Sequence, residues 1–268
     1  MTAVTRADFS GTIWPDDLRD LALATIVGGS PFAASLTRAP TSSGRVVWPL
    51  VDPSGADWVA EGAALPDLTL GDTTYVAAVH KLAGIIELSN ESVADTSYNL
   101  DQQVATALVD AFSAQLDTGL LNGTGDANNQ PTGVIGAATE TSDASLLQAA
   151  AAAVGEIGDA GGNPDTMALS FTQAATEAAR EDTAGQLVYP NGLPAALGLN
   201  EVRVPGLATP LVYDSRRVFL VVRDDFSVEQ SRHAAWRTDG VSLRVKGRFA
   251  VALPTPGKAI RKLAVVTA

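Results

Sequence analysis

The longest regular hydrophobic pattern in this chain lies between Asn99 and Gly123. Apolar residues recur there at every fourth position, so on a period of 3.6 residues they form a stripe that turns slowly around a helix of about six turns. The stripe consists of Leu100, Val104, Leu108, Phe112, Leu116 and Leu120. The closing Asn122-Gly123 pair suits the left-handed turn that ends many helices. The pattern predicts one long helix, along which the rest of the chain packs.

The face of this helix opposite the stripe is polar and acidic. It carries Asp101, Gln102, Asp110, Ser113 and Asp117. We expect such a face to lie in water or against another subunit. Asp110 and Asp117 are therefore candidate subunit contacts, and the apolar stripe is expected to pack on a sheet of its own subunit.

A second clear pattern is the strict alternation of apolar and polar residues over 241–253, which is typical of a strand with one buried face. The other face carries a basic stripe, and its members are further candidate subunit contacts: Arg244, Lys246 and Arg248. We expect this strand to receive the apolar stripe of the long helix.

The remaining elements are shorter, and they mix helices with strands, which predicts an α+β fold. Expected strands are 45–51, 75–89 as one long strand or a pair, 165–171, 217–223, and 263–267 at a sheet edge. Expected helices are 15–27, 89–96, 143–157 and 172–181.

Residues 52–74, between the first two expected strands, show no regular pattern and are rich in Gly, Pro, Asp and Ala. A structureless stretch of this length is uncommon in a compact domain and is usually functional. Trp58 would expose a large apolar ring there, so we expect a partner surface to cover it. Trp58 and the nearby Glu61 complete the set of candidate subunit contacts.

The composition excludes several kinds of site. The 268 residues include no cysteine, which excludes disulfides, iron–sulfur clusters and thiolate zinc sites. His80 and His233 are the only histidines, too few for a histidine metal cluster. We see neither a signal peptide nor a run of about eighteen apolar residues, so we expect a soluble protein without a membrane partner.

The formal net charge of −12 is unevenly distributed. Residues 1–135 hold five Lys and Arg against sixteen Asp and Glu, whereas residues 203–262 hold twelve against five. Such segregation indicates either nucleic-acid contact or a basic surface of one copy against an acidic surface of the next. The overall acidity argues against general affinity for nucleic acid, because a duplex would repel most of the surface.

The sequence predicts no catalytic residue, cofactor site or metal site. His233 lies close to Ser231, yet no nucleophile elbow or oxyanion motif surrounds it. The adjacent carboxylates at 16–17, 181–182 and 224–225 are better explained as turn and cap residues. The glycine-rich segment 121–133 lacks the lysine of a phosphate-binding loop and is interpreted as a connecting turn.

Several blocks occur in a characteristic order: Trp58–Gly62, Lys81–Ser97, Leu120–Ala137, Arg180–Pro190, Gly198–Val202, Arg223–Phe226, Asp239–Phe249 and Thr255–Leu263. In this order they resemble the major capsid proteins of tailed bacteriophages, which have the Hong Kong 97 fold. Each block is only moderately specific, but the ordered series is much stronger. The resemblance covers residues 45–265.

The resemblance implies a division of the chain into named parts. These would be an N-terminal arm (1–45), an extended loop over a neighbouring subunit (46–82), a peripheral domain with the long helix as its spine (83–135), an axial domain (136–226), further peripheral-domain strands (227–253) and a C-terminal axial-domain strand (254–268).

The implied function is to build, as pentamers and hexamers, the icosahedral head shell of a tailed phage around double-stranded DNA. The protein would reside in the virion after assembly in the host cytoplasm, without enzymatic activity. Expected partners are further copies, a portal protein, a cement protein, and packaged DNA held without sequence-specific contact. Scaffolding would be a separate protein, already removed or unnecessary, because no fused scaffolding segment is evident.

Two other functions stay open. An encapsulin, the shell protein of a cellular nanocompartment with a similar fold, would enclose cargo enzymes in place of a genome. A soluble hydrolase using His233 would belong to a different class. Some phage capsids also join subunits through a lysine of the extended loop; residues 52–74 contain no lysine, so we predict a non-covalent shell.

Overall fold

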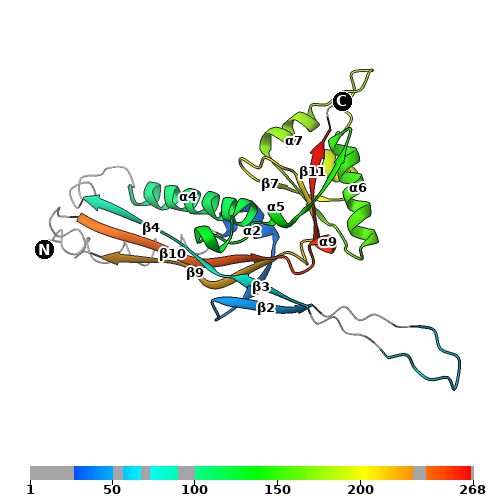
Figure 1. The fold of residues 1–268 in the computed structure, drawn as a ribbon. Coiled ribbons are helices and arrows are strands. Elements are labelled where there is room, and N and C mark those ends of the chain that lie inside the picture. The colour runs from blue at the N-terminus through cyan, green and yellow to red at the C-terminus, as the bar shows by residue number, and fades with distance from the viewer. Residues whose placement is uncertain (1–26, 51–56, 68–72, 90–99, 232–239, 267–268) are drawn as a thin grey trace, which may run out of the picture.

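The computed structural model describes residues 27–50, 57–67, 73–89, 100–231 and 240–266. One half of the molecule is a long, narrow sheet with a helix along it, and the other half is a second sheet with helices around it (Figure 1). A hairpin near their junction carries a loop that reaches well beyond the body (Figure 1). The expected helices at 15–27 and 89–96 lie outside the described residues, apart from a helical turn at 27–29 and Ser89, which is the last residue of a strand.

The long sheet has the strand order β1-β9-β10-β4. Its strands are β1 (Thr37–Pro40), β4 (His80–Ser89), β9 (Phe219–Ser231) and β10 (Gly240–Ala252). β10 pairs antiparallel with β9 on one side and with β4 on the other, so it forms the centre of the sheet. The predicted alternation is confirmed, because Leu243, Val245 and Phe249 are buried along one face of β10.

The long helix α4 (Leu100–Asn122) agrees with the predicted range and lies along this sheet (Figure 1). Leu116 and Leu120 share one core cluster with Phe249. Phe112 meets Phe226 of β9 edge-on, with ring centroids 5.7 Å apart. The apolar stripe of the helix therefore packs within its own subunit, as predicted.

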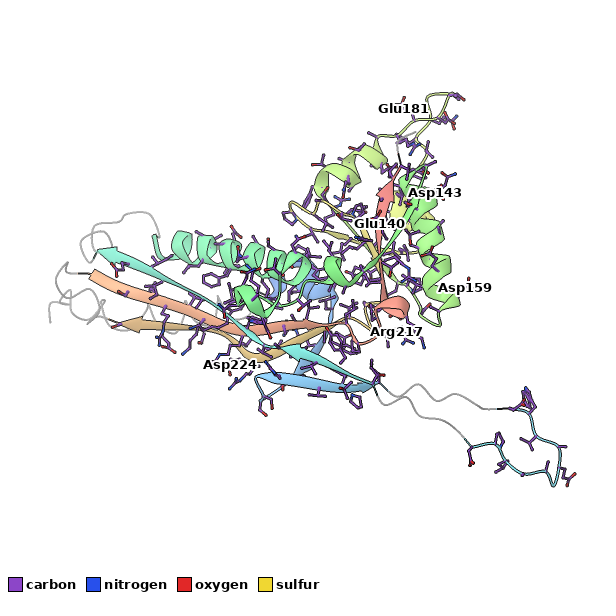
Figure 2. The ribbon with its side chains drawn as sticks, viewed as in Figure 1. Glu140, Asp143, Asp159, Glu181, Arg217 and Asp224 are labelled. Atoms are coloured by element: carbon purple, nitrogen blue, oxygen red, sulfur yellow. The ribbon has the colours of Figure 1, made fainter. Side chains whose placement is uncertain are left out.

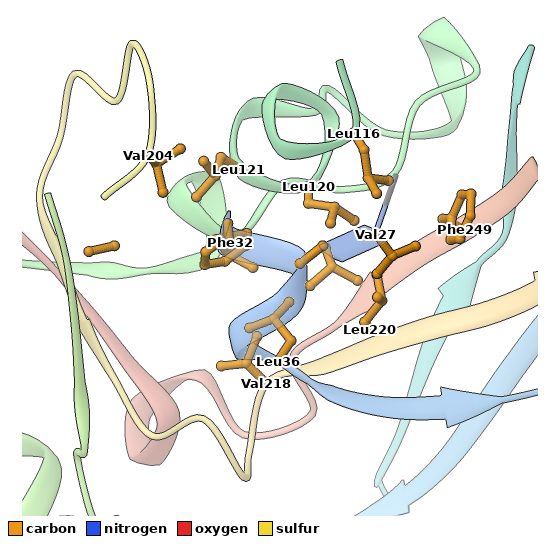
Figure 3. Close-up of a cluster of buried hydrophobic side chains, with 14 of the residues drawn as sticks. Val27, Phe32, Leu36, Leu116, Leu120, Leu121, Val204, Val218, Leu220 and Phe249 are labelled. Atoms are coloured by element: carbon orange, nitrogen blue, oxygen red, sulfur yellow. The ribbon is translucent and has the colours of Figure 1, made fainter. Parts of the chain in front are cut away.

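A segment before the first strand closes this core. It contains α2 (Pro31–Ser35) and places Val27, Phe32 and Leu36 between the end of α4 and β9 (Figure 3). Phe32 is fully buried and meets Tyr213 edge-on at 5.7 Å between ring centroids. This part of the predicted arm thus belongs to the core of its own subunit.

The second sheet has the order β5-β11-β8-β6-β7. Its strands are β5 (Thr139–Asp143), β6 (Thr166–Leu169), β7 (Asn200–Arg203), β8 (Leu211–Tyr213) and β11 (Ile260–Val265). The sequence predicted the last strand at a sheet edge, and this was wrong. β5 pairs in parallel with β11 from Thr139 to Asp143, and its polar sequence carries no strand pattern that could have revealed it.

Helices cover the second sheet (Figure 1). They are α6 (Leu146–Asp159), α7 (Phe171–Ala178), α8 (Leu193–Ala196) and α9 (Pro256–Ala259). α6 packs a face of small residues on the sheet, since Ala149, Ala150 and Ala153 are fully buried. Ser145 caps its N-terminus by accepting a hydrogen bond from the Gln148 amide, which is why the helix begins slightly later than predicted.

The third sheet is the two-stranded hairpin of β2 (Arg45–Leu50) and β3 (Thr73–Ala78). Predicted residues 75–89 therefore form parts of two strands, with Val79 between them. The hairpin packs on the face of the long sheet opposite α4, where Ala77 contacts the cluster of Ala250 and Ala252. Trp48 also stacks on Phe219 at 5.8 Å between ring centroids.

Candidate subunit-contact site

No described part of the chain covers the tip of the extended loop. Every described residue from 57 to 67 is exposed, and Trp58 and Leu65 are 101% and 82% exposed. Residues 52–74 hold five Asp and Glu and no Lys or Arg, so the tip combines apolar groups with one sign of charge. A surface of this kind is expected to be covered in the working state of the protein.

Trp58 and Glu61, the two candidate contact residues of the loop, both lie at its exposed tip. The Trp58 amide donates a hydrogen bond to the Asp57 carboxylate at 2.8 Å, a local contact that leaves the indole ring free. Glu61 lies nearby on the same exposed stretch. The structure brings both residues to one projecting tip, but their role in subunit contact stays a prediction.

The basic stripe lies on the face of β10 that the hairpin covers only in part. Ala250 and Ala252 are buried under the hairpin, whereas Arg244, Lys246 and Arg248 remain partly or fully exposed. Asp224, which pairs with one of these cations, is labelled on this sheet in Figure 2. The three cations are thus available at the surface.

Carboxylates of the same chain pair with this stripe. Lys246 and Arg244 both bind Glu229, and Arg248 binds Asp224 at 3.1 Å. The hydrogen bonds from Lys246 and Arg244 lower the pKa of Glu229 to about 2. Three cations therefore share two carboxylates, so the stripe keeps only a small positive excess for an outside partner.

Asp117 does not lie where the sequence predicted. It is 3% exposed and packs inside its own chain. The Ser30 hydroxyl donates to its carboxylate, and the amides of Ala33 and Phe32 approach it at 3.2 and 3.5 Å. The expectation of an exposed, subunit-facing Asp117 was wrong, because the segment with α2 covers this side of α4.

The neighbours of Asp117 show how closely α2 and α4 approach. Ser113, also predicted on the open face, is 4% exposed. A Cβ atom at Gly29 would lie 3.0 Å from the Ser113 Oγ, so a small residue is needed there. Asp110 remains exposed, and its role in subunit contact stays a prediction.

Burial raises the pKa of the Asp117 carboxyl above its ordinary value, although its hydrogen bonds oppose the rise. Close by, the hydroxyls of Ser35 and Tyr213 lie 2.6 Å apart, and burial raises the pKa of Tyr213 as well. These polar groups fix the segment with α2 to α4 and to β8 of the second sheet. The Ser30 hydroxyl makes no capping hydrogen bond to α2 and donates to Asp117 instead, a contact between distant residues that no local sequence pattern reveals.

The carboxylate pairs have structural roles where they are described. Asp182 accepts hydrogen bonds from the amides of Ala184 and Gln186, which lowers its pKa and closes the turn after α7. Glu181 begins this turn at the far end of the second sheet (Figure 2). The pair at 16–17 and His233 lie outside the described residues.

Metal ligands and membrane spans are absent from the described residues. These residues contain no group of three or more His, Cys, Asp or Glu placed to hold a metal ion. None of the helices in these parts of the chain has the length and hydrophobicity that a membrane crossing requires.

A long helix on a long sheet, a second helix-covered sheet and a projecting loop define a shell-forming structural protein. A model of the phage capsid family matches residues 10–265, and the chain belongs to this family. The protein is thus a capsid protein, a structural component of a virion. No curated protein sequence matches the chain.

Solved structures show the same fold. The chain is similar to a structure from Mycobacterium phage Adephagia at 21% identity and a TM-score of 0.75, over 89% of this chain and 91% of that chain. It is similar to one from Mycobacterium phage Cain at 20% identity and a TM-score of 0.74, over 100% of both chains. The capsid of a native GTA particle gives 16% identity and a TM-score of 0.68, over 89% and 90%. The predicted Hong Kong 97 fold is therefore confirmed.

Proposed function

We propose that this chain is the major capsid protein of a tailed bacteriophage and that many copies close into an icosahedral shell around double-stranded DNA. Membership of the phage capsid family supports this proposal. The observation that carries it is the extended loop, whose tip exposes the large apolar side chains of Trp58 and Leu65 in a single subunit. When a second copy covers it, such a tip acts as a contact between subunits.

The contact at the loop tip can be estimated from its area. An indole such as that of Trp58 buries about 150–250 Å². At about 25 cal/mol per Å², this corresponds to about 4–6 kcal/mol of transfer free energy before the costs of ordering are subtracted. One such contact per copy is weak, but a closed shell makes all of them together.

The remaining parts of this proposal concern role and partners. The protein acts as a structural component without catalysis, after assembly in the host cytoplasm. Its partners are further copies as pentamers and hexamers, a portal protein, a separate scaffolding protein and a cement protein. Arg244, Lys246, Arg248 and Asp110 are proposed contacts between copies. The domain boundaries after residues 45, 82, 135, 226 and 253 are part of the same proposal.

Negative-stain images of the purified protein test the proposal. We expect closed shells from the parent chain and loss of shells from a Trp58→Ala variant. The variant should unfold at the same temperature as the parent, since the indole has no cover within its own chain. Purified particles should protect double-stranded DNA from nuclease, whereas protection of cargo enzymes would indicate an encapsulin. A parent chain that stays monomeric under all conditions would refute the proposed function.

A further inference from the structure

The hairpin that carries the extended loop packs on the long sheet through Ala77 and Trp48, and its two strands join the body at its open end, which we call the root. The chain enters the hairpin between β1 and β2 and leaves it at Val79, between β3 and β4. Arg45 faces Ala78 across the open end of the hairpin, and His80 is the first residue of β4. Arg45 and His80 therefore flank the point at which the hairpin leaves the body.

Both root residues contact the same carboxylate. The Nε2 of His80 lies 2.9 Å from Oδ1 of Asp126, and the Nη2 of Arg45 lies 3.9 Å from its Oδ2. This Nε2–Oδ1 distance is short enough for a hydrogen bond from the imidazole to the carboxylate. The His80 side chain is 14% exposed, whereas the Arg45 pair is long and largely exposed. The histidine contact is thus the stronger of the two.

Asp126 begins η2 (Asp126–Asn128), in a loop that is closely tied to the end of α4. Thr124 and Thr132 form a bridge across this loop, and the Gln130 side-chain oxygen accepts from the Thr124 amide at 3.3 Å. A Cβ atom at Gly123 would lie only 2.1 Å from the carbonyl oxygen of Pro131. These contacts hold the loop that carries Asp126 against the end of the long helix.

The length of the hairpin amplifies any motion at its root. β3 spans about 20 Å at 3.3 Å per residue. The loop beyond it can add up to about 30 Å. A rotation of about 10° at the root would then move a tip about 50 Å away by about 9 Å, enough to break a contact with another copy.

We propose that Asp126 is the positioning residue of the extended loop, which sets its direction relative to α4 by holding both His80 and Arg45. This inference rests on the proposed function, because the direction of the loop matters only if the tip meets another copy. The glycine-rich segment after α4 was interpreted from the sequence as a connecting turn. Under this inference it also positions the extended loop, because it carries Asp126.

Spin-label distances test this inference directly. The chain contains no cysteine, so Ala111→Cys on α4 and Thr74→Cys on β3 create two unique labelling sites, both exposed. Labelled chains would be diluted in unlabelled ones, so that only distances within one chain are read. We expect one narrow distance distribution in the parent, loss of this distribution in Asp126→Ala, and no change in the matched control Asp159→Ala, an exposed aspartate at the end of α6 (Figure 2).

A second pair of variants separates positioning from general destabilisation. His80→Leu removes the donor and should also lose the narrow distribution, whereas His80→Gln keeps a donor and should retain it. An unchanged distribution in Asp126→Ala, together with shells from the parent chain, would overturn this inference and leave the proposed function intact. Absence of shells from the parent would overturn the proposed function, whatever the distances show.

Discussion

At the scale of single residues, Asp117 shows why position on a helix does not fix exposure. By period alone it lies opposite the apolar stripe of α4. The structure buries it because the segment with α2 packs on that side and supplies the hydroxyl of Ser30 as a donor. A buried carboxylate with donors around it holds a chain segment in place at the expense of desolvation. Asp117 is thus a structural residue of the subunit.

The burial of Asp117 predicts a pH-dependent effect of Asp117→Asn. The folded-state pKa lies above the ordinary value of 3.8, so the folded state binds the proton more tightly than the unfolded chain. The free energy of unfolding of the parent then falls as the pH rises from the pKa of the unfolded chain through the higher pKa of the folded state. We expect the variant to gain stability relative to the parent from pH 4 towards neutral pH, measured by urea unfolding at several pH values. A difference that does not change with pH would contradict this prediction.

Asp117→Ala is the natural control for the same site. It removes the acceptor and leaves buried donors unpaired, which costs about 1–3 kcal/mol at every pH. The alanine variant should therefore be less stable than the parent throughout the series. The asparagine variant keeps an acceptor oxygen and avoids this loss.

At the scale of elements, the loop from Gly123 to Gly133 depends on the absence of two side chains. A Cβ atom at Gly133 would lie 2.4 Å from the carbonyl oxygen of Leu121, and one at Gly123 would meet that of Pro131. The Gly133 amide donates to the Gly123 carbonyl at 2.8 Å, which closes the loop. The two glycines permit a close approach of two backbone segments.

We therefore expect Gly123→Ala to lower the free energy of unfolding by about 2 kcal/mol or more, because backbone atoms cannot yield as a side chain can. Gly136→Ala is the matched control. Gly136 lies in α5 (Val134–Ala137), where an added Cβ atom would meet nothing within 4 Å, so this variant should stay within about 1 kcal/mol of the parent. Equal stability of the two variants in thermal or urea unfolding would contradict the expected clash.

The elements also show what the sequence could predict. α4 and β10 have long, regular patterns of period 3.6 and 2, and both were predicted to within a residue or two. β5 and β7 are short and polar, and their strand character comes from pairing with β11 and β6, which no local pattern reveals. The same holds for Asp126, since its contact to His80 joins residues far apart in the chain.

At the scale of the whole molecule, most large apolar side chains are buried within one subunit, whereas those of the loop tip would be buried only by a proposed neighbour. The two sheets, α4 and the segment with α2 cover one another within one chain. No described part of the chain covers the loop tip, and in the proposed shell a neighbouring copy would cover it. A shell held by many such contacts is stable as a closed particle without any covalent link.

Boiling assembled particles in detergent tests whether such links exist. An isopeptide bond would need a lysine amine on the loop, and residues 52–74 contain none, while Lys81 lies on β4 in the body. We expect a single band near 27.6 kDa on the denaturing gel. Particles treated with an amine-reactive cross-linker serve as the control, because they should give a ladder on the same gel. A ladder from untreated particles would contradict the predicted non-covalent shell.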